Sequence, residues 1–187
     1  MQETASSEWL RTYYFTRAAV AAAWVGAALT IGKSMPPVSI ALLIAYPAWD
    51  AAANLIDARR SGGLKANPSQ QLNFLVSLLT TAAVIWSVGY SSHTVLVVFG
   101  VWATLSGLLQ LATGVRRWRT GAQWAMVLSG AQSALAGGFI IKRAADIAAP
   151  AASDIAAYAT FGGFYFLVSA IWLTVLMARS SSTERTA

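Results

Sequence analysis

Long apolar stretches are the feature that most constrains the fold of this chain. A helix that crosses the hydrocarbon core of a bilayer needs about 20 mostly apolar residues. Six segments meet this requirement: residues 12–32, 38–58, 70–90, 93–115, 121–141 and 155–178. They lack the alternation of apolar and polar residues that a membrane β-barrel requires. The sequence therefore predicts an all-α integral membrane protein with six transmembrane helices, formed as a single domain over residues 1–187.

Charged residues are too few for a soluble domain of this length. They make up 11% of the 187 residues, while 57% are hydrophobic. Soluble domains average about 25% charged residues, and a domain of this size has no interior large enough to bury so much apolar surface. The apolar segments are therefore expected to face lipid and one another.

Two patterns indicate an internal repeat. The connections between the segments are short, which favours antiparallel neighbours and predicts three αα-hairpins. The Phe-Gly pair and the arginine of the fourth span recur 62 residues later in the sixth, as Phe99-Gly100 and Arg117 against Phe161-Gly162 and Arg179. Arg59-Arg60 ends the second span as Arg116-Arg117 ends the fourth. These matches predict a pseudo-threefold repeat; the alternative is chance similarity between apolar helices rich in small residues.

The distribution of lysine and arginine predicts the orientation. Ten of the 13 basic residues lie at the two termini and in the second and fourth connections, and three lie in the other connections (Lys33, Lys142 and Arg143). Basic residues accumulate in cytoplasmic loops, so both termini are expected in the cytoplasm of a bacterial cell, with the chain in its inner membrane. The net charge of +6 then indicates contact with anionic lipid at the cytoplasmic loops rather than with nucleic acid. The oligomeric state is left open, a homo-oligomer included.

One group of polar residues lies within an apolar segment. Asp50, Asn54 and Asp57 are spaced by four and three residues, so they share one face of the second helix. Nine residues separate Asp50 from Arg59, or roughly 13 Å of helix rise, which places Asp50 inside the hydrocarbon layer. A carboxylate there costs about 2.5–3.5 kcal/mol. We therefore expect Asp50 to face the protein interior and to have a partner, for which Arg17 on the first helix is the candidate.

This polar group allows two interpretations. In the functional one, Asp50 is a proton or cation site to which Asn54 adds a carbonyl oxygen. In the structural one, Asp50 and Arg17 are a buried ion pair that ties the first two helices together, while Asp57 lies at the membrane interface. Gln110 would approach Asn54 if the repeats pack around a common axis.

Residue usage argues against catalysis. The chain has no cysteine and a single histidine, which removes thiolate chemistry and the ligands of a typical zinc site. It also lacks a glycine-rich phosphate-binding loop and a Ser/His/Asp arrangement. We therefore expect no enzymatic activity, catalytic residue, metal or cofactor.

Part of the chain resembles a known family. Residues 99–110 (FGVWATLSGLLQ), 115–119 (VRRWR) and 123–130 (QWAMVLSG) resemble the HdeD-like membrane proteins, and the similarity is clearest from 93 to 178. These proteins are built from short repeated helix pairs and are named for a member involved in acid resistance. The resemblance implies a multi-pass membrane protein of undefined role in the acid-stress response. The alternative function is a small transporter or proton-coupled channel that works through Asp50.

Overall fold

The computed structural model describes residues 2–116, 124–146 and 151–184. Six long helices follow one another: α1 (Gln2–Leu29), α3 (Pro36–Arg60), α4 (Pro68–Val88), α5 (Ser92–Arg116), α6 (Trp124–Asp146) and α7 (Ala156–Glu184). The short helix α2 (Ile31–Ser34) and two 3₁₀ turns, η1 (Leu64–Ala66) and η3 (Ala152–Ile155), lie between them. Each long helix falls on one predicted span. Arg117, Arg119 and Arg185, which entered the charge count, lie outside the described residues.

Helix length and hydropathy support the membrane assignment. Within the described residues, five segments are long and apolar enough to cross a membrane: Ser7–Ser34, Pro36–Arg60, Pro68–Val88, Ser92–Ala112 and Ala152–Arg179. The predicted fifth span, 121–141, begins outside the described residues and continues as α6. The all-α membrane fold is confirmed.

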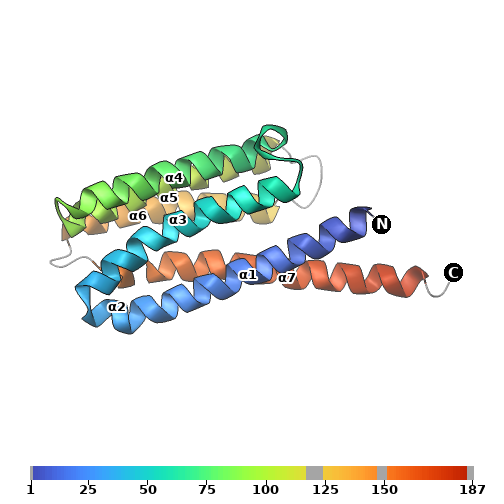
Figure 1. The fold of residues 1–187 in the computed structure, drawn as a ribbon, viewed down its shortest axis with the longest axis horizontal. Coiled ribbons are helices and arrows are strands. Elements are labelled where there is room, and N and C mark those ends of the chain that lie inside the picture. The colour runs from blue at the N-terminus through green and yellow to red at the C-terminus, as the bar shows by residue number, and fades with distance from the viewer. Residues whose placement is uncertain (1, 117–123, 147–150, 185–187) are drawn as a thin grey trace.

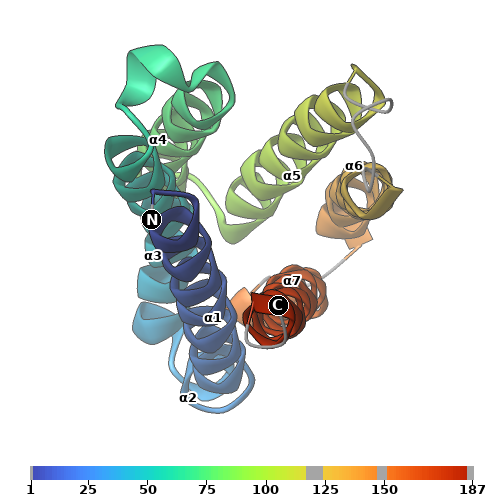
Figure 2. The ribbon, with the colours of Figure 1, turned by 90° about the vertical axis from the view of Figure 1, so that its right-hand side faces the viewer.

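The helices associate as three close pairs. The hairpins α3–α4 and α5–α6 are formed by helices adjacent in sequence, and the third pair joins the first helix, α1, to the last, α7. The end view in Figure 2 shows the pairs arranged around a common centre. The bundle therefore contains three helix pairs, as three hairpins require. The close pairs join the second span to the third, the fourth to the fifth and the first to the sixth.

Small residues explain two of these pairs. A Cβ atom added to Gly107 would lie 2.3 Å from the backbone nitrogen of Ala134, and one added to Gly137 would lie 2.5 Å from the carbonyl oxygen of Gly100. Helices α5 and α6 are therefore in backbone contact, which only glycine permits here. In the α1–α7 pair, a Cβ on Gly163 would lie 3.0 Å from the Cβ of Ala21. This close approach favours α7 as the neighbour of α1.

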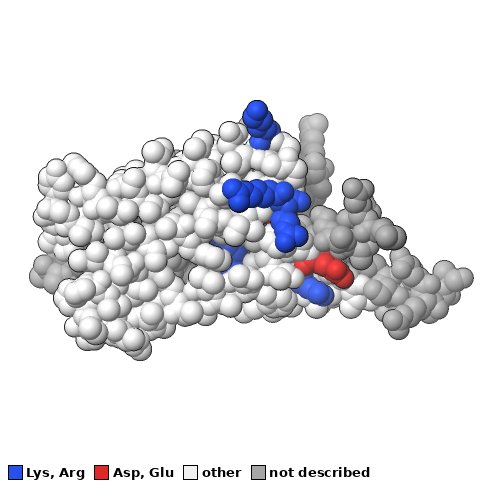
Figure 3. All heavy atoms as spheres, viewed as in Figure 1, with Lys and Arg blue, Asp and Glu red and all other residues white. Residues whose placement is uncertain are grey.

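The two ends of the bundle differ in charge. Both termini and the α3–α4 connection lie at one end, called here the terminal end, and α2 marks the other, the α2 end (Figure 1). The basic residues visible in Figure 3 gather toward the terminal end. Lys33 in α2 and Arg143 near the end of α6 belong to the α2 end, where Arg143 pairs with Asp154 at 3.7 Å. The fold thus separates the two groups of basic residues that the sequence distinguished.

The apolar core occupies only the half of the bundle near the α2 end. Its buried side chains come from the last turns of α1, α4 and α6, the first turns of α3, α5 and α7, and η3. The largest of them are Trp24, Leu43, Val84, Leu96, Phe99, Trp102, Ile140 and Ile155. Both connections at this end of α3–α5 are short, with Met35 between α2 and α3 and Gly89–Ser91 between α4 and α5. At the terminal end, Gly62 and Gly63 adopt positive φ angles of 96° and 91° in a longer connection. The described connections of α3, α4 and α5 are thus shorter at the α2 end than at the terminal end.

Candidate functional site

A cavity of about 730 Å³ occupies the centre of the bundle. All six long helices contribute to its lining, which runs from Trp24 and Tyr46 beside the core to Asp57 and Gln70 near the terminal end. Its volume lies within the range of about 300–1,000 Å³ typical of small-molecule sites. The lining contains five amide side chains, those of Asn54, Gln70, Asn73, Gln110 and Gln132, together with serine hydroxyls and aromatic rings.

Arg17 and Asp50 form an ion pair on the wall of this cavity. Nη2 of Arg17 contacts Oδ1 of Asp50, so the partner predicted for Asp50 is the one present. Nη1 of Arg17 donates a hydrogen bond of 3.1 Å to the hydroxyl of Tyr13, and the guanidinium lies 4.3 Å from the ring centroid of Phe166 on α7. Arg17 therefore connects α1 to both α3 and α7.

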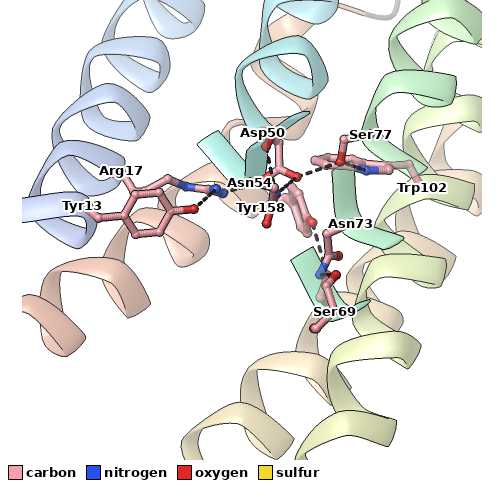
Figure 4. Close-up of polar contacts among 10 residues, drawn as sticks. Tyr13, Arg17, Asp50, Asn54, Ser69, Asn73, Ser77, Trp102 and Tyr158 are labelled. Carbon is pink, nitrogen blue, oxygen red and sulfur yellow. Dashed lines mark hydrogen bonds and ion pairs between the residues drawn. The ribbon is translucent and has the colours of Figure 1, made fainter. Parts of the chain in front are cut away.

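The second carboxylate oxygen of Asp50 is also hydrogen-bonded. Oδ2 accepts from Oγ of Ser77 at 2.7 Å and from Nδ2 of Asn54 at 3.0 Å. The indole N–H of Trp102 in turn donates to Oγ of Ser77 at 3.2 Å. Figure 4 shows this network running from α5 through α4 and α3 to α1. Asp50 is thus the point at which four helices meet through polar contacts.

The ion pair is only partly enclosed by protein. The side chains of Arg17 and Asp50 keep 11% and 18% of their surface exposed, and both line the cavity. The carboxylate therefore combines features of both interpretations drawn from the sequence, since it is salt-bridged as a helix clamp would be and accessible as a transport site would be.

Asn54 and Gln110 line the same cavity from α3 and α5. Asn54 uses its amide N–H groups toward Asp50, donating to the backbone carbonyl at 2.8 Å as well as to the carboxylate. Gln110 was predicted to approach Asn54. The two side chains line the same cavity, but no hydrogen bond joins them.

Asp57 is buried within the protein. Only 6% of its surface is exposed. Its Oδ1 accepts from the indole N–H of Trp9 at 3.1 Å, and its Oδ2 accepts from Nε2 of Gln70 at 3.2 Å. The guanidinium of Arg60 lies 4.9 Å from the ring centroid of Trp9 and not on the carboxylate. Among the described residues, Asp57 thus has neutral hydrogen-bond donors and no ion-pair partner.

Aromatic residues separate the cavity from the core. The ring of Tyr46 packs edge-on against Trp24, Trp102 and Tyr158, with ring centroids 4.9, 5.8 and 6.4 Å away. Tyr158 shares a hydrogen bond of 3.2 Å with Ser133, and Tyr165 donates one of 2.7 Å to Gln132. These two contacts join α7 to α6 across the cavity wall.

Sequence reasoning did not single out the roles of Ser77, Trp102 and Tyr13. One signal could have indicated Ser77, since it occupies the repeat position of Ser129, and both serines line or contact the site. No sequence pattern distinguishes Trp102 from other interior aromatic residues. For metal binding, the described residues contain no group of three or more His, Cys, Asp or Glu side chains able to hold an ion.

Comparison with known proteins gives one family match. Residues 74–142 match a family described as a short repeat of unknown function (DUF308). The match begins in α4, includes all of α5 and extends into α6, a little over a third of the chain. No curated protein and no solved structure matches the chain significantly. The matching segment overlaps the region in which the sequence resembles HdeD-like proteins.

Proposed function

We propose that this protein is a non-enzymatic membrane transport protein that binds a small solute in its central cavity. One observation carries the proposal: six apolar helices surround a cavity of about 730 Å³ whose wall bears the Arg17–Asp50 pair. Charged side chains at membrane depth are costly, face the bundle interior or a water-filled space, and often mark a solute or ion pathway.

A purely structural clamp accounts for less of the site. The Arg17–Asp50 pair does tie α1 to α3, but a clamp alone needs no amide and hydroxyl groups around a space. Polar groups that have no protein partner are costly unless water or a solute satisfies them. Gln110 and Ser106 line the cavity from one face of α5, and Arg17 lines it from α1. This lining favours a binding site over a scaffold.

The proposed orientation places the terminal end in the cytoplasm of a bacterial cell, in contact with the anionic lipid of the inner membrane. It is supported by the separation of Lys33 and Arg143 from the basic residues of the terminal end. The part of the cavity lined by Asp57 and Gln70 would then lie toward the cytoplasm. Reporter fusions at the C-terminus and in the 142–154 connection should report opposite sides of the membrane.

Flux in proteoliposomes tests the transport function. Uptake of glycerol, choline and glutamate would be followed by light scattering, and proton entry by internal pyranine. At least one flux should be faster with the wild type than with Asp50→Asn or with Ser106→Phe, which fills the cavity from α5. Equal rates for all four probes in wild type and both variants, with folding intact, would reject transport in favour of a structural role.

A role in the acid-stress response is a second proposal. It is supported by the resemblance of residues 93–178 to HdeD-like proteins, part of which falls in the segment that matches the repeat family. Cells lacking the protein should survive a low-pH challenge less well than cells in which it is restored. Equal survival would remove this role without affecting the transport proposal.

A further inference from the structure

We infer that the cavity is selective for small organic cations and that the carboxylate of Asp57 is the group that attracts them. The inference rests on the proposed function, because it assigns a substrate class to the same cavity.

The charges of the cavity lining do not balance. Among the residues that the structure describes, three formally charged ones line it: Arg17, Asp50 and Asp57. Arg17 and Asp50 neutralise each other as an ion pair, which leaves the carboxylate of Asp57 and a net lining charge of −1 (one positive and two negative). A buried carboxylate whose charge is not compensated is energetically unfavourable. A cation bound in the cavity would supply the compensating charge.

The carboxylate of Asp57 is held in place without being saturated. Trp9 and Gln70 each donate one hydrogen bond, to different oxygens. An ionised carboxylate offers about four acceptor sites, so about two remain for a ligand or water. Because both donors are neutral, they orient the carboxylate without compensating its negative charge.

The aromatic lining adds a second basis for cation binding. The faces of Tyr, Trp and Phe rings attract cations within about 6 Å of the ring centroid. The cavity already stabilises one cation in this way, since the guanidinium of Arg17 lies 4.3 Å from the centroid of Phe166 and 5.8 Å from that of Tyr13. Tyr14 and Trp49 also line the cavity from α1 and α3. Carboxylates and ring faces together are the features that recognise substituted ammonium groups.

An anion fits the same lining poorly. Arg17, the one cation among the described lining residues, already contacts Asp50 and Phe166. The basic residues that follow Asp57 in the sequence, Arg59, Arg60 and Lys65, are exposed, so solvent and salt screen their attraction. An anion in the cavity would instead meet the uncompensated charge of Asp57.

Binding of benzyltrimethylammonium to the full-length protein in nanodiscs tests the inference. Its neutral isostere, neopentylbenzene, has the same shape without the charge, and benzoate carries the opposite charge. Titration calorimetry should show the cation binding at least about tenfold more tightly than either comparison compound, since one charge–charge contact in a cavity is worth about 1.4 kcal/mol or more.

Variants then assign the charge to Asp57. Asp57→Asn should weaken binding of the cation about tenfold, whereas Asp57→Glu should retain most of it. Glu8→Gln removes an exposed carboxylate from the same end of the bundle and should leave the affinity unchanged. Ser106→Phe should abolish binding because it fills the space. Thermal unfolding of each variant checks that the fold is retained.

The outcomes separate this inference from the transport proposal. If neopentylbenzene or benzoate binds as tightly as the cation and Ser106→Phe blocks it, the cavity binds solutes and cation selectivity is wrong. An unchanged affinity in a folded Asp57→Asn variant would reject the role of Asp57. Absence of binding by all three compounds would reject the cation inference, and the flux measurement would then decide the transport proposal independently.

Discussion

The same helices pack closely around an apolar core in one half of the bundle and surround a polar cavity in the other half. Near the α2 end, Leu43, Val84 and Phe99 are fully enclosed, and three helix pairs converge on one apolar core. Toward the terminal end, the same helices surround a space lined by charged, amide and hydroxyl groups. The aromatic rings of Tyr46 and Trp102 lie where the two halves meet.

The difference between the halves indicates that one half holds the helices together and the other encloses polar groups. Lipid is as apolar as leucine, so burial of apolar side chains gives little drive for helices to associate within a membrane. Close packing of small and aromatic residues at one end, with the backbone contacts of α5 and α6, must therefore hold the bundle together. Once that end is fixed, the other can enclose polar groups that would be unfavourable against lipid.

Separating α5 from α6 should have the largest effect. Gly107→Val places a side chain against the backbone of Ala134, where even a Cβ would lie 2.3 Å from the nitrogen. The helices must move apart, and we expect a loss of about 4 kcal/mol or more. Gly138→Val on α6 is the matched control, because its Cβ would meet nothing within 4 Å. Similar thermal unfolding of the two variants in nanodiscs would contradict the close α5–α6 contact.

Truncation in the packed half should cost nearly as much. Phe99 has 0% of its surface exposed, so Phe99→Ala leaves a cavity and should cost about 3–5 kcal/mol. Phe161→Ala removes the same ring at a position 53% exposed and should cost far less. Chemical unfolding of both variants measures the difference. Equal losses would contradict the enclosure of Phe99 in the apolar core.

Removal of the carboxylate of Asp50 should produce a smaller loss of stability. Asp50→Ala leaves the guanidinium of Arg17 without its ionic partner, which typically costs about 3–5 kcal/mol in a buried site. We expect the low end of this range, since the cavity can hydrate Arg17. Asp50→Asn should be milder because its amide oxygen can still accept from Arg17. Thermal unfolding should rank wild type, Asn and Ala in that order; two variants as stable as wild type would mean that the pair contributes nothing.

Serine substitutions should give the smallest effects and should distinguish the two halves. Ser77 joins Trp102 to Asp50, so Ser77→Ala leaves a buried indole N–H without its partner and should cost about 1–2 kcal/mol. Ser87 is equally buried but donates to a carbonyl of its own helix, that of Ala83, at 2.6 Å. Ser87→Ala should therefore cost less than Ser77→Ala. The reverse order would show that the polar network around Asp50 does not link the helices.

Much of the fold could be predicted from local sequence. The spans follow from hydropathy and length alone, and the pairing of Asp50 with Arg17 follows from the depth of a charge that lipid cannot solvate. The spacing of Asp50, Asn54 and Asp57 correctly placed all three on one side of α3, where they line the cavity. These predictions succeeded because each depends on residues close in sequence or on a single unfavourable group.

The pairing of the helices, the burial of Asp57 and the central cavity depend on the tertiary structure and not on any single helix. The pairing of α1 with α7 depends on the contact between Ala21 and Gly163, which lie far apart in the sequence. The contacts of Asp57 with Trp9 of α1 and Gln70 of α4 likewise exist only in the folded chain. The central cavity is lined by all three close pairs, so it exists only once the pairs have assembled. Hydropathy determines which segments enter the membrane, but helix rotation and partner choice depend on the fit of side chains that only the folded chain brings together.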